Sequence, residues 1–388
     1  MKRKIRRSGL NFILFFVIFL VGSSNVFAEN GSRKIIVFKK GVTDTLVQTK
    51  LVEDLKGIKI KSLKLINAMA ADLSSDSEKE ILNRPEVERI DDDIIIYAIK
   101  RPSKPQPPQV LPWGVDRINA EIAWDPAAVS DIKVAIVDTG ILLNHSDLVN
   151  NIKGNINTIN SSKSGNDDNG HGTHVAGIIA AMNNSIGVVG VAPYISLYAV
   201  KVLGKNGTGW LSDIIEGLDW CINNGIDVVN MSLGSSSGNL SYHEAIIRAY
   251  QAGIVLVAAS GNEGGPVGYP AAYSEVIAVA ATDNLDNIAS WSNRGPEVDL
   301  SAPGVSIYST YKDGYYKTLS GTSMATPHVA GAAALVMSRP VDALYDLDAN
   351  GKWDPDEVME KLKDSAEDLG FETDLQGAGL VRPDLAVE

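Results

Sequence analysis

The stretch Lys133-Val134-Ala135-Ile136-Val137-Asp138-Thr139-Gly140 joins a continuous apolar run to an acid and a glycine. A run of this kind, rich in β-branched residues, is typical of a strand that is buried on both faces. Further apolar runs alternate with helical patterns along the chain. The expected strands cover residues 133–137, 196–202, 227–231, 253–258 and 276–281, and the expected helices cover 171–182, 212–223, 241–251 and 322–338. This alternation predicts an α/β fold, with a mostly parallel sheet flanked by helices on both faces.

Three short strings lie at expected strand ends and helix starts, where open α/β sheets place their ligands. They are Val137-Asp138-Thr139-Gly140, His171-Gly172-Thr173-His174-Val175-Ala176-Gly177 and Gly321-Thr322-Ser323-Met324-Ala325-Thr326-Pro327. Taken alone, Asp138 would more often be a turn residue, His171 a structural histidine and Ser323 a helix N-cap. Together they supply an acid, a base and a nucleophile in one of three known chain orders for the same catalytic geometry. We therefore expect Asp138 to orient His171, His171 to act as general base and Ser323 to act as nucleophile.

These strings closely resemble those of the subtilisin-like serine proteases, and the resemblance runs from about residue 109 to about residue 386. It implies a serine endopeptidase that works through an acyl-enzyme intermediate. Asn262, between two glycines, matches the oxyanion-hole asparagine of the family. Its side-chain amide would donate to the developing oxyanion together with the backbone N–H of Ser323.

The resemblance also implies where substrate binds. One segment would pair with the extended substrate backbone and form one wall of the S1 pocket, a second would form the opposite wall, and a glycine would form the floor. The implied residues are Ser232, Leu233, Gly234, Ala258, Ala259, Ser260, Gly261 and Gly268. Small and apolar walls predict broad specificity that favours large apolar P1 side chains of protein or peptide substrates.

The N-terminus predicts export. Five basic residues within 1–7 precede an apolar run over 10–22 and the small-residue site Val26-Phe27-Ala28. This pattern is typical of a secretory signal peptide over residues 1–28, and the apolar run is short for a membrane anchor. We expect a secreted protein without a membrane span after the signal is removed.

Residues 29–100 are expected to form a separate small domain. Their patterns follow the order β-α-β-β-α-β of a split βαβ, or ferredoxin-like, unit. This domain resembles the inhibitory propeptide of the subtilisin family, and the alternative is an independent binding domain. Four prolines within residues 101–109 predict an extended linker where the precursor is cut. The peptidase domain would then cover residues 110–388.

Charge divides the chain at this linker. Residues 1–108 carry a net charge of +7 and residues 109–388 a net charge of −19. A basic leader and an acidic body attract one another. The acidic body argues against nucleic acid as a partner, because it has no basic stripe to replace phosphate counterions. We expect the mature enzyme to be a monomer. The single cysteine, Cys221, allows no internal disulfide.

Two calcium sites and one weaker cation site are expected. The resemblance implies a site formed by Gln109, Asp147, Met182, Asn184, Ile186 and Val188, and a weaker cation site near Ala271, Tyr273, Val276 and Asp299. Independently of the resemblance, residues 346–357 match a calcium-loop pattern of alternating oxygen ligands with glycine at position 6 and glutamate at position 12. Its ligands would be Asp346, Asp348, Asn350, Lys352, Asp354 and Glu357. The alternative for each is a polar surface turn.

Two other functions use the same cleft. A peptide-binding pseudo-protease would lack one of the four catalytic positions, and all four are filled. A dedicated processing protease that cuts one partner at a basic site would favour an acidic pocket floor, where this chain has Gly268. Zinc catalysis would use His171 and His174, but the glutamate and third ligand of a zinc protease are missing from the motif.

Overall fold

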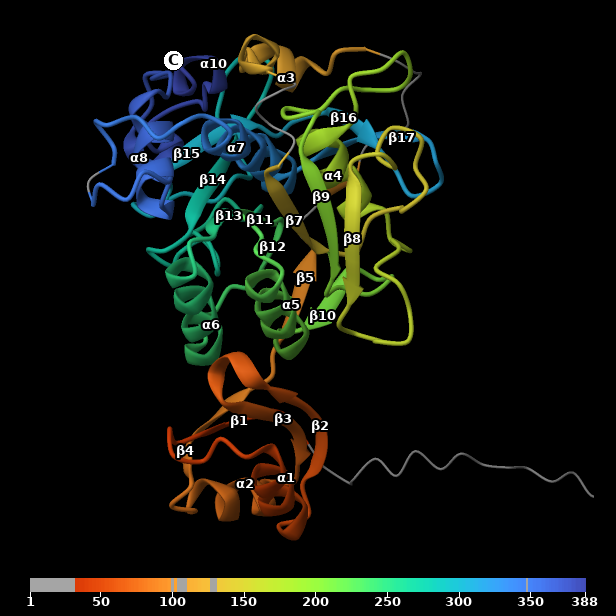
Figure 1. The fold of residues 1–388 in the computed structure, drawn as a ribbon, viewed down its shortest axis with the longest axis vertical. Helices are drawn as coiled ribbons and strands as arrows, with labels where there is room; N and C mark the ends of the chain where they lie inside the picture. The colour runs from red at the N-terminus through yellow and green to blue at the C-terminus, as the bar shows by residue number, and fades with distance from the viewer. Residues whose placement is uncertain (1–31, 99–100, 103–109, 126–130, 347) are drawn as a thin grey trace, which may run out of the picture.

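The computed structural model describes residues 32–98, 101–102, 110–125, 131–346 and 348–388. The expected signal peptide and most of the expected linker, including Gln109, lie outside the described residues. Figure 1 shows a small N-terminal unit placed against α5 and α6 of a larger α/β body. No helix in the described part of the chain is long and apolar enough to cross a membrane.

A seven-stranded parallel sheet forms the centre of the body. Its order is β15-β14-β13-β11-β7-β9-β8. The strands are β7 (Lys133–Asp138), β8 (Ile152–Asn157), β9 (Ser196–Lys201), β11 (Val228–Met231), β13 (Val255–Ala259), β14 (Ile277–Thr282) and β15 (Leu300–Pro303). The five strands expected from apolar runs are all present, and the parallel α/β fold is confirmed.

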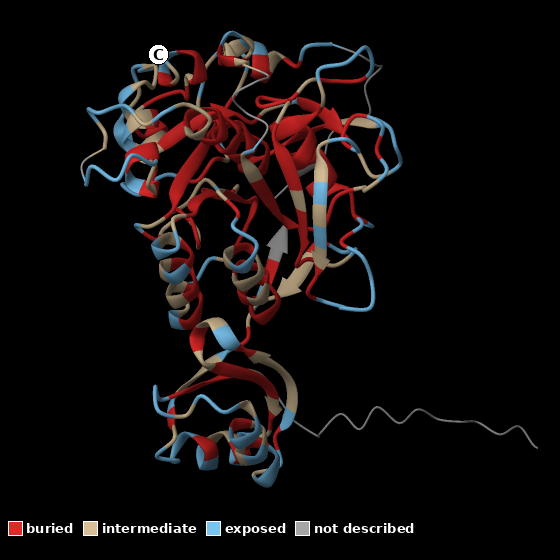
Figure 2. Cartoon of the chain, viewed as in Figure 1, coloured by how far each residue is buried: buried red, intermediate tan, exposed pale blue. Residues whose placement is uncertain are grey.

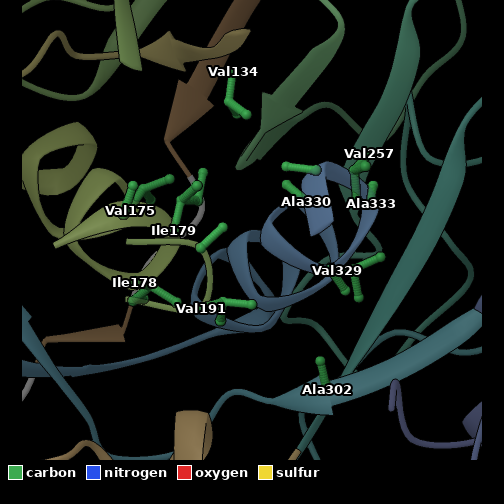
Figure 3. Close-up of a cluster of buried hydrophobic side chains, with 14 of the residues drawn as sticks. Val134, Val175, Ile178, Ile179, Val191, Val257, Ala302, Val329, Ala330 and Ala333 are labelled. Carbon is green, nitrogen blue, oxygen red and sulfur yellow. The ribbon is translucent and has the colours of Figure 1, made fainter. Parts of the chain in front are cut away.

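Helices cover both faces of this sheet, and the alternation along β7 shows why. Val134 and Ile136 point into one buried cluster with α4 (His171–Ala180) and α7 (Thr322–Met337). Ala135 and Val137 point into the opposite cluster with α5 (Leu211–Asn223) and α6 (Leu240–Gln251). Figure 3 shows apolar side chains of α4 and α7, two helices that contact one another. Figure 2 shows that the strands of the sheet are largely buried.

Helix α4 ends at Ala180, two residues earlier than the pattern predicts. The backbone N–H of Met182 donates to the carbonyl of Asp147 at 2.9 Å instead of continuing the helix. The remaining short helices of the body lie near its N- and C-terminal segments. They are α3 (Trp113–Arg117), η2 (Ala120–Ala123), α8 (Pro355–Asp364), α9 (Thr373–Gln376) and α10 (Pro383–Ala386).

The N-terminal unit has the expected β-α-β-β-α-β order and its own small core. It contains β1 (Ser32–Phe38), α1 (Thr45–Asp54), β2 (Ile58–Leu63), η1 (Lys64–Ile66), β3 (Ala68–Leu73), α2 (Ser75–Leu82) and β4 (Val87–Asp92). The sheet is antiparallel, in the order β2-β3-β1-β4. Ser74 caps α2 by accepting from the backbone N–H of Ser77 at 3.1 Å, and serine is a favoured residue at this position.

The chain then leaves the small sheet and pairs with the body. Strand β5 (Ile95–Ala98) lies antiparallel between β10 (Thr208–Trp210) and β12 (Leu233–Gly234). Strand β6 (Arg101–Pro102) pairs with β17 (Tyr316–Ser320), which also pairs with β16 (Ile307–Thr310). The β-α-β-β-α-β pattern of residues 29–100 predicts that its last strands, over residues 87–97, belong to the small sheet. Only β4 does so, because the hydrogen bonds of β5 go to strands of the body.

Candidate active site

Asp138 and His171 form a buried pair at the carboxyl edge of the sheet. Asp138 is the last residue of β7 and His171 the first residue of α4, and neither side chain is exposed. Nδ1 of His171 lies 2.9 Å and 2.8 Å from the two carboxylate oxygens of Asp138. A proton on Nδ1 satisfies this contact, so Nε2 carries the lone pair that a general base requires.

The start of α4 is held by the buried carboxylate of Asp167. One of its oxygens accepts from the hydroxyl of Thr139 at 3.0 Å and from the backbone N–H of Gly170 at 2.9 Å. The other accepts from the hydroxyl of Thr173 at 2.6 Å. A carboxylate at a helix N-terminus is favoured by the helix dipole. Asp167 thereby connects the strand end beside Asp138 to the first turn that begins with His171.

Ser323 lies in the first turn of α7 and is fully buried. Its hydroxyl is 3.2 Å from the carbonyl of Ser232, and the Ser232 hydroxyl donates to the Ser323 carbonyl at 2.9 Å. Helix α7 packs directly against α4. Ser232 follows β11, the parallel neighbour of β7, so its contact with Ser323 lies at the same carboxyl edge of the sheet as Asp138.

Asn262 is tied to the residue before Ser323. Its Oδ1 accepts from the backbone N–H of Thr322 at 2.9 Å and from the Thr322 hydroxyl at 3.1 Å. The same hydroxyl accepts from the backbone N–H of Gly261 at 3.2 Å. Because Oδ1 is used in this way, the donor end of the amide, Nδ2, is turned away from Thr322. A neutral donor held beside a serine at a helix start can stabilise an oxyanion.

Two other buried histidines, His174 and His328, differ from His171 in their surroundings. Nε2 of His174 lies 3.1 Å from the carbonyl of Ile307 and 2.9 Å from that of Lys317, and burial lowers the pKa of His174 to about 3. Burial also lowers the pKa of His328 to about 4. Both imidazoles are neutral at pH 7 and donate to backbone carbonyls.

Residues 130–381 match the subtilase family. This chain belongs to the subtilase family. It is 46% identical over 309 residues to a thermostable alkaline protease of Halalkalibacterium halodurans. The aligned segment covers 79% of this chain and 82% of the relative. It is 48% identical over 280 residues to Subtilisin Savinase of Lederbergia lenta, covering 72% of this chain and 99% of that protein.

A third relative, subtilisin amylosacchariticus of Bacillus subtilis subsp. amylosacchariticus, is 39% identical over 387 residues, or 96% of each chain. The match therefore extends across the N-terminal unit of this subtilase as well as the body. With the family established, the protein is a serine endopeptidase that acts on protein or peptide substrates.

The structure brings the implied substrate-binding residues of the subtilase together. Gly268 connects the two expected walls: its N–H donates to the carbonyl of Ser260 at 2.8 Å, and the next residue, Tyr269, exchanges backbone hydrogen bonds of 2.9 Å with Ser235. A Cβ at position 268 would lie 3.1 Å from the Ser235 carbonyl oxygen. Glycine therefore lets the segments close around this point. The expected wall residues are all buried: Ser232, Leu233, Gly234, Ala258, Ala259, Ser260 and Gly261.

Several contributing residues were missed at the sequence level. Strand β10 flanks β5 opposite β12, yet it has only three residues and no apolar run. Asp167 and Thr322 act through contacts that depend on loop geometry. Two of these features had a signal in the sequence. Glycines at 207 and 209 flank Thr208 of β10, and a polar run that includes Asp167 precedes His171.

Several residues expected at the first calcium site lie near one another in the described part of the chain. The Asp147 carboxylate accepts from Asn184 Nδ2 and from the backbone N–H of Val188, both at 2.9 Å, and from the Tyr316 hydroxyl at 2.8 Å. The loop that contains Met182 and Ile186 therefore lies against Asp147, as the resemblance implies. At the weaker expected site, Asp299 accepts from the backbone N–H of Ala278 at 2.9 Å.

The second expected calcium loop folds around its acidic residues. Oxygens of Asp346, Asp348 and Glu357 lie within 4.8 Å of one another. Asn350 donates through Nδ2 to Asp348 at 2.9 Å and to Asp354 at 2.8 Å. Gly351 has φ +73°, a conformation that favours glycine and produces the sharp turn. Lys352 follows it, and its backbone N–H donates to Asn350 Oδ1 at 2.7 Å.

Proposed function

We propose that Asp138, His171 and Ser323 form the catalytic triad of this serine endopeptidase and that Asn262 stabilises the oxyanion. The Ser323 hydroxyl oxygen attacks the peptide carbonyl carbon while Nε2 of His171 takes the hydroxyl proton. His171 returns that proton to the leaving amine, and a water activated by the same base hydrolyses the acyl-enzyme. The buried contact between Asp138 and Nδ1 of His171 is the observation that carries this proposal.

Labelling with a sulfonyl fluoride tests this assignment. A phenylmethylsulfonyl group should attach to Ser323 in the mature enzyme and abolish hydrolysis. Ser309 serves as the internal comparison and should stay unlabelled. It is a buried serine whose hydroxyl donates to the His174 carbonyl at 2.8 Å. Peptide mass mapping that finds the label on another serine would contradict the triad.

We infer that the N-terminal unit, residues 29–100, is an inhibitory propeptide that occupies the cleft as a substrate would. Leu233 of β12 pairs with Ala98, and Gly234 pairs with Tyr97. These are two of the residues that the family resemblance assigns to backbone pairing with substrate. An extended segment that fills a strand position between β10 and β12 excludes other peptides from the same hydrogen bonds.

Hydrogen bonds and ion pairs between the N-terminal unit and the body support this intramolecular complex. Asp93, fully buried, accepts from the backbone N–H of Ser212 at 3.1 Å and from its hydroxyl at 2.9 Å, which caps the first turn of α5. Lys61 is paired with Glu216 at 3.0 Å, and Arg89 with Glu244 at 3.2 Å. In both ion pairs the basic side chain belongs to the leader and the acidic one to the body, as the charge division predicts.

The two strand pairings support a cut just before the proline-rich linker, and not within residues 101–109 as the sequence predicts. Ala98 is paired with Leu233, and the carbonyl of the preceding residue, Ser232, is 3.2 Å from the Ser323 hydroxyl. On the other side of the nucleophile, Arg101 is paired with Ser320. We therefore propose that one of the three peptide bonds between Ala98 and Arg101 is cut, N-terminal to the 101–109 stretch.

Proline substitution tests the role of β5 in this cut. Tyr97→Pro removes a backbone donor from the paired strand and should leave most of the precursor uncut. Gln106→Pro makes the same change in the linker and should leave processing unaltered. Equal processing of the two variants would show that pairing of β5 does not present the bond to Ser323.

We propose that residues 1–28 direct secretion and that the mature enzyme is a monomer with broad specificity for large apolar P1 residues. The small and buried residues around Gly268 support the specificity. One methylene in an apolar pocket discriminates by only about 1–3 kcal/mol, so preference is graded. A peptide library should show faster cleavage after Phe, Leu, Tyr or Met than after Asp or Lys. Strict cleavage after Arg or Lys would favour a processing protease.

We propose that Ca²⁺ binds at two sites and stabilises the folded enzyme. Asp147 and Asn184 supply oxygens at the first site, where Gln109 and the carbonyls of Met182, Ile186 and Val188 would complete the ligand set. The second site is the loop of residues 346–357, with the Lys352 carbonyl at position 7. Its three converging carboxylates and the glycine turn fit a hard, oxygen-seeking cation.

A further inference from the structure

Asn293 holds the loop that carries Asn262. Its buried Oδ1 accepts from the backbone N–H of Glu263 at 2.9 Å and of Gly265 at 3.2 Å. Its Nδ2 donates to the carbonyl of Ser260 at 3.1 Å and to the Glu263 carboxylate at 3.2 Å. One amide thus binds both arms of the loop and uses its donor and acceptor ends in doing so.

The backbone is shaped to let this amide in. Gly261 has φ +119°, and a Cβ there would lie 2.2 Å from Nδ2 of Asn293. The backbone N–H of Asn293 also donates to the Gly261 carbonyl at 3.0 Å. The Glu263 carboxylate held by Asn293 accepts from the backbone N–H of Asn262 at 2.9 Å. Contacts of Asn293 therefore reach the residues on both sides of Asn262 and, through Glu263, its own backbone.

We propose that Asn293 is a positioning residue for the oxyanion hole, an inference that rests on the proposed role of Asn262. Thr322 fixes the side-chain oxygen of Asn262, whereas Asn293 fixes the backbone from which that side chain projects. Both constraints are needed to aim Nδ2, since an oxyanion donor acts only over a narrow range of distance. A side chain with a donor and an acceptor end is required, which aspartate cannot supply when ionised.

Asn293→Asp tests the proposal with little change in shape. It keeps an acceptor for the two N–H groups but places a carboxylate oxygen against the Ser260 carbonyl and the Glu263 carboxylate. We expect kcat on a chromogenic peptide to fall about tenfold or more, less than the about 10²–10³ for complete loss of a donor, with KM nearly unchanged. Affinity for a peptide aldehyde, which forms a tetrahedral adduct, should fall in parallel. Asn287→Asp, in an exposed turn of the same segment, is the matched control.

A double-mutant cycle separates positioning from a general structural role. If Asn293 acts through Asn262, the variant that combines Asn262→Ala with Asn293→Asp is no slower than Asn262→Ala alone. The proposal would be overturned if the kcat losses of the two single variants multiplied in the double variant. It would also be overturned if Asn293→Asp changed only KM or the melting temperature. An Asn262→Ala enzyme with normal kcat would instead refute the oxyanion role itself. The rate of precursor self-cleavage is measured in each variant, so a chain that matures slowly still reports on the same step.

Discussion

Both carboxylate oxygens of Asp138 lie close to Nδ1 of His171, at 2.9 Å and 2.8 Å, in a site where neither side chain is exposed. Water does not compete for this contact, so the imidazole has a fixed ring orientation and a fixed tautomer. The same carboxylate accepts from the backbone N–H of Thr139 at 2.6 Å, which holds it at the end of β7.

Replacing Asp138 with asparagine should therefore lower kcat by about 10⁴ while KM stays nearly constant, because the amide favours the wrong tautomer of His171. Steady-state kinetics on a chromogenic peptide measure both constants. Asp219→Asn, on helix α5, makes the same chemical change away from the site and should leave both constants unaltered. A tenfold loss or less in Asp138→Asn would show that Asp138 does not orient the base.

The buried histidines predict that stability falls on acidification. Burial lowers the pKa of His174 to about 3 and that of His328 to about 4, against an ordinary value of 6.5. Below pH 6.5 the unfolded chain binds protons that the folded chain does not, so the free energy of unfolding decreases as pH falls. The contribution of these two neutral histidines to the free energy of unfolding is present in full above about pH 6.5. It is lost as the pH falls to about 3 to 4.

Urea unfolding between pH 7 and pH 4 measures this effect, in a Ser323→Ala background that prevents autolysis. His174→Gln keeps a donor for the two carbonyls, and its stability should depend less steeply on pH than that of the parent. Equal slopes in the two proteins would show that His174 is protonated in the folded state.

The loop of residues 346–357 should bind one calcium ion independently of the site near Asn184. In the parent protein the backbone N–H of Asp354 donates to the Glu357 carboxylate at 2.9 Å. Glu357→Gln removes one negative charge but keeps an oxygen that can accept this hydrogen bond, so the cap of α8 is retained. Calcium that binds only the folded state adds roughly 2.7 kcal/mol to the free energy of unfolding when its free concentration is about a hundred times Kd. Thermal stability in calcium should therefore fall, with early turnover nearly normal.

Isothermal titration compares the number of bound ions in the two proteins. We expect one fewer in Glu357→Gln, whereas Glu360→Gln, an exposed residue on the same helix, should match the parent. Equal ion counts for Glu357→Gln and the parent would identify the loop as an acidic turn.

The sequence predicts those features that depend on nearby residues. The apolar run before Asp138 identifies β7, Ser74 marks the start of α2, and the spacing from Asp346 to Glu357 identifies a loop whose carboxylates converge. The place of β5 is different, because its partners at Thr208 and Leu233 are more than a hundred residues away. The apolar run at 95–98 indicates a strand but does not identify the strands with which it pairs.

The same limit applies inside the site. Asn293 has no motif of its own, and its role follows from four side-chain hydrogen bonds that form only when β13 and the segment after β14 are folded together. Asn262 was found because its glycines resemble a family motif. The residue that holds it could be found only from the geometry.

The most direct test of the central claim is the intact mass and N-terminal sequence of the purified precursor, expressed without other proteases, with and without Ser323→Ala. Wild-type protein should convert to a chain that begins at residue 99, 100 or 101, with the leader released, while Ser323→Ala stays whole. A Ser323→Ala precursor that is cut at the same bond would show that Ser323 is not the nucleophile of this subtilase.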